Sequence, residues 1–405
     1  MKNQLTIIAL TIGLFLGNIT LTLAQSDQNS TPSQGSSLTD QQSAAIDYLK
    51  PGKSRFLLRG YAHSGLEMTS EEASFVGGAF NPLLVFRQSD RLLFEGELEI
   101  ELEDGETHLG LEYANMSYLL SDAITIRAGK FLLPFGTYVP NLHPAWINKF
   151  PTNPLGAGHD GILPSADIGI ELRGASYLGN IKTNYSIYAV NGPQLNDGSV
   201  EVEEGGVLHY DIAPDNNKGK SFGGRLGFFP MSNSALEIGI SGLYGKVGNK
   251  DGDYEDIAAF LYAFDMSYVQ RLSSIRSVID LKAQYAAADV DKAAFPEEDD
   301  PTELHSFDNS SSTWFAQLSI RPAFVSSKLV QNLELATRYS SIETPEGAPW
   351  EANQRQWEVG LNYWFDWRTL VKVSYRTVSG ETGGHSEDEE SGGEDSFFIH
   401  WAIGF

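Results

Sequence analysis

The chain has 405 residues, of which 41% are hydrophobic, and its formal net charge is −25. This acidity argues against nucleic acid as a partner, because phosphate binding needs clustered lysine and arginine. The absence of cysteine excludes disulfide scaffolds, thiolate metal sites and cysteine nucleophiles. Beyond the N-terminus no run approaches the roughly 18 apolar residues of a membrane-spanning helix, whereas a transmembrane barrel needs only alternate apolar residues.

Residues 1–24 have the features of a secretory signal peptide: Lys2, an apolar core and a small-residue cleavage site. A retained membrane anchor is the alternative interpretation. Residues 25–53 are predicted to form a polar, flexible tether, with one short helix over 38–50. Residues 54–405 then form the main domain.

From residue 54 onward the sequence alternates between apolar and polar residues, and the segment 92–103 shows this most clearly. Leu92, Phe94 and Leu98 share one parity, while Glu95, Glu97 and Glu99 share the other. Successive side chains of a strand point to opposite faces, so this strand has an apolar face and an acidic face. A soluble sheet with one solvent-exposed face would give the same pattern, so the links between strands are needed to distinguish it from a membrane barrel.

Short polar links alternate along the chain with mostly longer links that are rich in glycine or acid. The short links are 88–90, 121–122, 179–180, 231–234, 272–275, 326–327 and 365–368, and the longer ones are 63–74, 104–106, 132–166, 191–220, 248–256, 289–312, 340–355 and 379–395. Fifteen links join sixteen strands, with both ends on the short-turn side. This pattern predicts an all-β fold, a transmembrane antiparallel up-and-down β-barrel of 16 strands in the outer membrane of a Gram-negative bacterium.

Aromatic residues support the barrel prediction independently, because one stands beside each short link. They are Phe86, Tyr118, Tyr177, Phe229, Tyr268, Phe324 and Phe365. Rings at equivalent places are typical of the aromatic girdle at a membrane interface. The last strand, 396–405, alternates in the same way and ends in Phe405, as outer-membrane barrels commonly do.

Parity also predicts which charged side chains face the lumen, because arginine or lysine in lipid costs about 2–4 kcal/mol at the bilayer midplane. The predicted pore-lining residues are Arg59, Glu95, Glu97, Glu99, Glu112, Arg127, Glu171, Arg173, Arg225 and Arg376. Acidic and basic walls facing each other would orient polar solutes and set ion preference. The alternative is that these charges pair with one another and only keep the lumen wet.

The link 132–166 is rich in proline and aromatic residues, which makes it too stiff and apolar for a loose surface loop. We interpret it as a constriction loop folded into the lumen, with an outer lid or a subunit contact as the alternatives. Its candidate residues are Phe135, Tyr138, His143, Trp146, Lys149, His159 and Asp160.

The segment Ala128-Gly-Lys-Phe-Leu-Leu-Pro-Phe-Gly136, with the aromatic, proline-rich stretch behind it, resembles the corresponding segment of the phosphate-selective porin O/P family. The resemblance implies a 16-stranded porin, commonly a homotrimer, that passes small anions. The outer links are acidic, for example 297–300 and 387–390, and such a mouth would attract cations and repel phosphate. Phosphate selectivity is therefore not part of the prediction.

We predict an outer-membrane porin for passive diffusion of small polar solutes or ions, in contact with lipid and lipopolysaccharide. A plugged structural or adhesive barrel, acting through its acidic loops, is the alternative. No cofactor or metal is expected, and a calcium site at 251–256 lacks the full EF-hand spacing. Catalysis is not expected either, because the eight histidines are scattered and no nucleophile or phosphate-binding motif is present.

Overall fold

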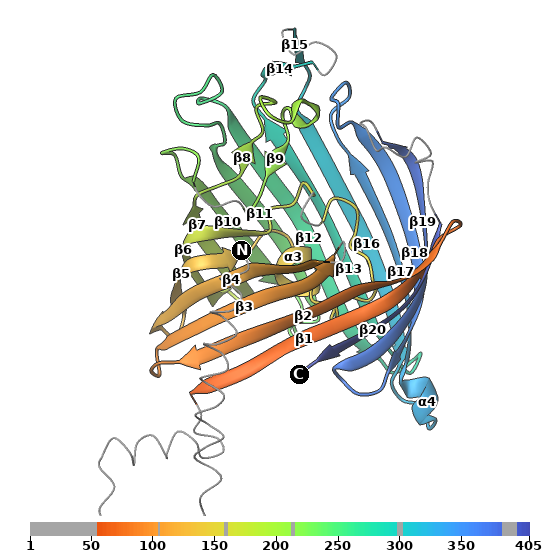
Figure 1. The fold of residues 1–405 in the computed structure, drawn as a ribbon. Helices are drawn as coiled ribbons and strands as arrows, with labels where there is room; N and C mark the ends of the chain where they lie inside the picture. Colours follow the sequence, from red (N-terminus) through yellow and green to blue (C-terminus); the bar gives the residue numbers. More distant parts are fainter. Residues whose placement is uncertain (1–54, 104–105, 158–160, 212–214, 298–302, 383–394) are drawn as a thin grey trace, which may run out of the picture. The chain divides into compact units, whose positions relative to one another are not determined.

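The computed structural model describes residues 55–103, 106–157, 161–211, 215–297, 303–382 and 395–405. Sixteen antiparallel strands form one closed barrel, in which each strand pairs with the next along the chain and β20 pairs with β1 (Figure 1). The barrel strands are β1 (Phe56–Met68), β2 (Ala73–Arg87), β3 (Leu92–Glu103), β4 (Glu106–Ser121), β5 (Ile124–Leu132), β6 (Ala166–Leu178), β7 (Ile181–Val190), β10 (Ser221–Phe229), β11 (Leu236–Lys246), β12 (Ala258–Leu272), β13 (Ser277–Val290), β16 (Ser310–Pro322), β17 (Leu333–Glu343), β18 (Ala352–Trp364), β19 (Thr369–Thr382) and β20 (Ser396–Gly404). The predicted fold and strand number are confirmed.

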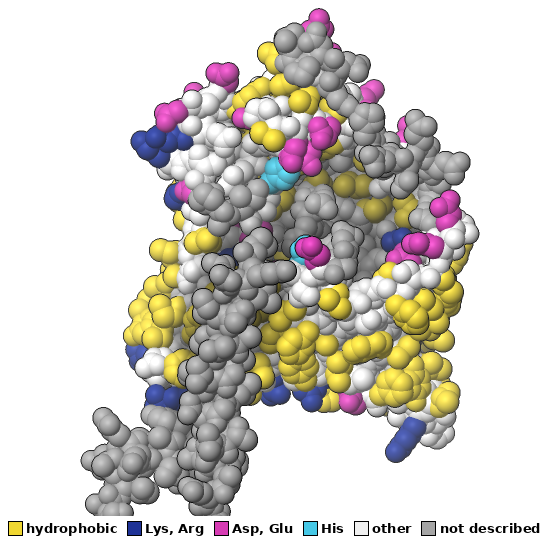
Figure 2. Space-filling model, viewed as in Figure 1, with side chains coloured by type: hydrophobic (Ala, Val, Ile, Leu, Met, Phe, Trp, Pro, Cys, Tyr) yellow, Lys and Arg dark blue, Asp and Glu magenta, His cyan; other side chains and the backbone are white. Residues whose placement is uncertain are grey.

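Alternation along the strands separates an apolar outer face from a polar inner face. On β6, Ile168, Ile170 and Leu172 are 43%, 60% and 38% exposed, whereas Glu171 is buried. Figure 2 shows hydrophobic side chains gathered on the outer wall, with Asp and Glu at the rim above them. The helices in the described ranges are all too short or too polar to cross a membrane.

Several links differ from their predicted bounds; the link predicted at 340–355, for example, is 344–351, because β17 ends at Glu343 and β18 begins at Ala352. β1 continues to Met68, so the first link is a turn of residues 69–72, in which the Thr69 hydroxyl accepts hydrogen bonds from two backbone N–H groups. A short turn was predicted at 326–327, but the link spans 323–332 and contains the helix α4 (Lys328–Gln331). β13 and β16 extend into the predicted link 289–312, because their backbones pair as far as Asp289 and Ser310.

Short elements that alternation alone does not predict lie in the longer links. Two small sheets pair β8 (Gln194–Leu195) with β9 (Leu208–His209), and β14 (Ala294–Pro296) with β15 (Leu304–Ser306). A 3-10 turn, η1 (Val202–Glu204), lies between β8 and β9. The link between β5 and β6 contains the short helix α3 (Tyr138–Leu142). The predicted signal peptide, tether and first helix lie outside the described residues.

Ile170→Lys should destabilise the barrel, because Ile170 is 60% exposed on the apolar outer face. Lysine facing lipid near the midplane costs about 2–4 kcal/mol, whereas the lumen tolerates charge. Thr125→Lys is the matched control, since Thr125 lines an inner cavity. Urea unfolding in lipid vesicles should show the loss for Ile170→Lys alone. Equal losses for both variants would contradict the assignment of the two faces.

Candidate functional site

The link between β5 and β6 folds into the barrel in its described residues, 133–157 and 161–165, here called the inner loop (Figure 1). Its Phe135 and Tyr138 are 2% and 3% exposed, and they belong to one apolar cluster with residues of β11, β12, β13 and β16. The Tyr138 ring meets Phe315 edge to face at 5.7 Å. The inner wall that the loop packs against is rich in alanine, at positions 259, 263, 286 and 288. These small side chains leave room for the loop to pack against the wall.

Hydrogen bonds fix the segment before α3 to the same wall. The Gln284 Oε1 atom accepts from the backbone N–H groups of Thr137 and Tyr138, at 2.7 and 3.0 Å. The Ser241 hydroxyl accepts from Gly136 N–H at 3.0 Å. Gly136 has φ +64°, and a Cβ there would lie 2.3 Å from the Gln284 amide oxygen. Glycine is therefore required where the loop turns against β11 and β13.

A buried ion pair holds the middle of the loop. Arg338 on β17 and Glu358 on β18 pair at 2.8 Å, and both side chains are fully buried. Arg338 also donates to the backbone carbonyl of Thr152 at 2.9 Å, and the Thr152 hydroxyl donates to Glu358 at 2.6 Å. The Arg338 guanidinium lies 4.8 Å from the centre of the Phe150 ring. The pair is thus completed by the loop, which closes over it.

Two lysines attach the neighbouring part of the loop to β17 and β19. Lys149 pairs with Glu334 at 2.9 Å. Lys372, which is fully buried, donates to the backbone carbonyls of Ala145 and Phe150 at 2.6 and 3.0 Å. These contacts hold the loop against the side of the lumen formed by β11 to β19.

The predicted constriction-loop residues therefore face the wall. Phe135, Tyr138 and Lys149 make the contacts described above, and Trp146 packs edge to face against Trp367 at 6.2 Å. The Nδ1 atom of His143 faces the Val139 carbonyl oxygen, and burial lowers the pKa of this histidine below its ordinary value. His159 and Asp160 lie outside the described residues.

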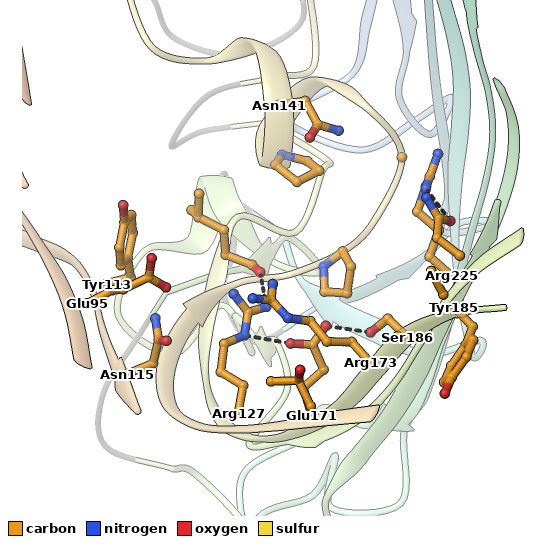
Figure 3. Close-up of a pocket in the computed structure, with 18 residues that line it drawn as sticks. Glu95, Tyr113, Asn115, Arg127, Asn141, Glu171, Arg173, Tyr185, Ser186 and Arg225 are labelled. Carbon is orange, nitrogen blue, oxygen red and sulfur yellow. Dashed lines mark hydrogen bonds and ion pairs between the residues drawn. The ribbon is translucent and has the colours of Figure 1, made fainter. Parts of the chain in front are cut away.

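A cavity of about 580 Å³ remains between the inner loop and the opposite wall (Figure 3). It is lined by Glu95, Tyr113, Asn115, Thr125, Arg127, Leu132, Pro134, Gly136, Pro140, Asn141, Glu171, Arg173, Gly174, Ala175, Asn184, Tyr185, Ser186 and Arg225. The wall residues come from β3 to β7 and from β10. Five predicted pore-lining residues, Glu95, Arg127, Glu171, Arg173 and Arg225, thus meet at one cavity.

Arg127 and Arg173 lie side by side in this cavity, beneath the loop (Figure 3). Arg127 pairs with Glu171 on the adjacent strand at 2.5 Å, and Glu171 also accepts a hydrogen bond from the Ser186 hydroxyl. Within the described residues Arg173 forms no ion pair, and its charge acts on Arg127. Arg173 is therefore the base in the cavity whose charge is available to a passing solute.

Arg225 lies on another side of the cavity and is fully compensated. Its guanidinium makes two contacts with Asp265, at 3.0 and 2.5 Å, and one with Glu237 at 2.9 Å. For Arg225, therefore, the alternative interpretation is correct: this inward charge pairs with other inward charges.

The acidic side of the cavity is formed by β3 and β4, with Glu95, Tyr113 and Asn115 together in Figure 3. No ion pair between described residues includes Glu95 or Glu97. The predicted residues Glu99 and Glu112 lie further along the same two strands: Glu99 is in register with Gly110, and Glu112 is at the register shift between β3 and β4.

Two predicted residues lie elsewhere. Arg59 is in register with Leu83, which is in register with Glu97, and residues in register share a face of the sheet. Arg59 therefore faces the lumen, but it does not line the cavity. Arg376 pairs with Glu67 at 3.3 Å, between β19 and β1. Tyr113, Asn115 and Asn141 were not predicted. Alternation counted from Glu112 places Tyr113 and Asn115 on the outer face, and it is the register shift at Glu112 that makes them face inward.

Comparison with protein-family models gave no match, and comparison with curated protein sequences also gave none. Solved structures with the same fold include the outer membrane channel DcaP of Acinetobacter baumannii, with a TM-score of 0.55 and 12% identity, covering 86% of this chain and 97% of that chain. Salmonella typhi OmpF matches with a TM-score of 0.56 and 14% identity, over 86% and 97%. The anion-selective porin from Comamonas acidovorans matches with a TM-score of 0.53 and 8% identity, over 86% and 99%.

These likenesses show the fold. The chain has the 16-stranded barrel of the outer-membrane porins. The specific resemblance to the O/P family is not tested by them, and it stays a prediction.

Proposed function

We propose that this protein is a channel through which small polar solutes and ions diffuse passively across the outer membrane of a Gram-negative bacterium. The observation that carries the proposal is the inner loop, which is fixed to one side of the lumen and leaves a cavity of about 580 Å³ on the other. A loop that merely filled the barrel would need no such one-sided attachment. The apolar outer face and the signal-peptide features support the membrane location.

Charge separation across the cavity supports a preference among solutes. Arg173 on β6 and Glu95 on β3 lack ion-pair partners among the described residues, and they belong to different parts of the lining. Fixed charges of opposite sign orient a dipolar solute as it passes. We infer that small solutes carrying both charges are better accommodated than apolar ones, and that phosphate has no dedicated site.

Liposome swelling tests the proposal. Proteoliposomes should swell in isotonic sugars and amino acids, faster for the smaller solutes, because the cavity is of small-molecule size. Protein-free liposomes are the control. If proteoliposomes swell no faster than these, the channel proposal is wrong.

A plugged barrel is the second candidate, favoured by packing among the outer links. Phe295, Phe307 and Trp350 form an aromatic cluster, and the Tyr210 hydroxyl donates to the Ile162 carbonyl of the inner loop. Such contacts would support an adhesive or structural role through the acidic loops. It predicts no swelling. Trimer assembly and lipopolysaccharide binding stay predictions.

A further inference from the structure

Four side chains on the acidic side of the lumen form a compact group, here called the acidic quartet. Glu95 and Glu97 lie on β3, and in register with them on β4 are Asn115 and Tyr113. Side chains directly opposite in an antiparallel pair have Cβ atoms about 4.5–5.5 Å apart, and residues i and i+2 share one face. Glu95, Tyr113 and Asn115 lie together in Figure 3. The four side chains therefore share the lumen face of the β3–β4 pair.

Two oxygen atoms of the quartet are buried without a hydrogen-bond donor. Glu97 is 4% exposed and Asn115 is 3% exposed, yet Glu97 Oε1 and Asn115 Oδ1 have no partner. The charge of Glu97 acts on the hydroxyls of Tyr61 and Tyr113, and Tyr61 accepts a hydrogen bond from Asn81 at 3.0 Å. Buried acceptors are nearly always satisfied in native proteins, so both oxygens have the capacity to accept a further donor or to bind a cation.

The negative charge of the quartet favours a cation over a neutral hydrogen-bond donor. Glu95 and Glu97 have no ion-pair partner in the described part of the chain. The charge of Glu95 acts on Arg127, but Arg127 already pairs with Glu171 at 2.5 Å. The quartet offers two carboxylates, an amide carbonyl and a phenol, and no nitrogen or sulfur ligand. Oxygen-only donor sets suit hard cations, and Ca²⁺ tolerates the irregular geometry of side chains on a strand pair.

We propose that the acidic quartet binds a divalent hard cation of the Ca²⁺ class on the lumen wall. Bound Ca²⁺ offsets the two quartet carboxylates and so reduces the attraction of the cavity for other cations. Binding itself does not depend on the channel being open, whereas the effect on ion preference rests on the proposed function.

Calorimetric titration of the folded, detergent-solubilised chain with Ca²⁺ tests the site. Glu97→Gln should weaken the quartet component of binding at least about tenfold, the scale on which metal sites respond to the loss of a supporting group. Asn115→Leu changes no charge and should still weaken it, which separates ligation from general attraction. Glu95→Gln is a further variant should Glu97→Gln fail to fold. Glu343→Gln, on the exposed end of β17, is the matched control.

Retention of the wild-type isotherm by Glu95→Gln, or by folded Glu97→Gln, would overturn the site and assign Ca²⁺ binding to the outer loops. The same result for Asn115→Leu would overturn the ligand set. In planar bilayers millimolar Ca²⁺ should lower the cation preference of the wild type and of Glu343→Gln, but not of Glu95→Gln. If Ca²⁺ binds at the quartet and no variant conducts, the channel proposal fails while the site stands. If the wild type and all variants conduct and respond to Ca²⁺ in the same way, the proposed site is wrong while the channel proposal stands.

Discussion

Arg338→Met is expected to lower the free energy of unfolding of the barrel by about 3–5 kcal/mol, the usual cost of removing one partner of a buried ion pair. Arg338 and Glu358 are both fully buried, so the variant leaves Glu358 as an uncompensated charge. The inner loop also loses two hydrogen bonds at Thr152 and the stacking of Arg338 on Phe150. We therefore expect a larger and noisier single-channel conductance.

The double variant Arg338→Met/Glu358→Met is the control for this prediction. Replacing both partners by apolar side chains removes the unpaired charge, and such replacements are often close to neutral in stability. Urea unfolding in lipid vesicles should show most of the stability restored. The enlarged conductance should persist, because Thr152 still lacks its partners on the wall. A single variant as stable as the wild type would show that the pair does not secure the loop.

Arg173→Glu should make the channel more selective for cations. The change reverses a basic charge of the cavity that lacks an ion-pair partner among the described residues. Unit charges 4 Å apart in bulk water interact by about 1 kcal/mol, so reversing one charge changes the energy of a passing ion by about 2 kcal/mol before screening. With a Debye length of about 8 Å in physiological salt, we expect a roughly three- to tenfold rise in the cation-to-anion permeability ratio.

Reversal potentials across asymmetric KCl measure this ratio. Arg91→Glu is the matched control, because it makes the same charge change at an exposed turn outside the cavity. Its reversal potential should stay close to that of the wild type. Equal shifts in the two variants would mean that net charge, and not the cavity wall, sets the selectivity.

The barrel was predictable because its signals are local and repeated. Glu95 and Glu97 show the inward parity of β3 within three residues, and the turn at 88–90 marks where the strand begins. Alternation predicts the inward face of a strand less well where the strand contains a β-bulge. At Glu112 the register between β3 and β4 shifts, so one residue of β4 has no partner. A shift of this kind reverses the two faces beyond it, and alternation alone does not locate it.

The site was less predictable, because its geometry depends on contacts between distant parts of the chain. Proline and aromatic residues in 132–166 indicated an inward loop, but not the wall that it covers. That choice follows from small alanines on β12 and β13 and from the buried Arg338–Glu358 pair, whose members lie 186 and 206 residues beyond Thr152. Tyr138 and Trp146 therefore had the character of pore residues in the sequence and act as packing residues in the structure.

We propose that solutes pass between the inner loop and the wall of β3 to β7 and β10, while the loop covers β11 to β19. Because the chain has no cysteine, single cysteines can be placed on either wall without background. Thr125→Cys lies in the cavity, whereas Ser340→Cys replaces a fully buried side chain that accepts a hydrogen bond from Leu155 N–H.

The decisive measurement is the single-channel current of each cysteine variant before and after a charged methanethiosulfonate reagent is added. The current through Thr125→Cys should fall on modification, and Ser340→Cys should stay unmodified with its current unchanged. Rapid modification and block of Ser340→Cys, with Thr125→Cys unaffected, would contradict this path for solutes.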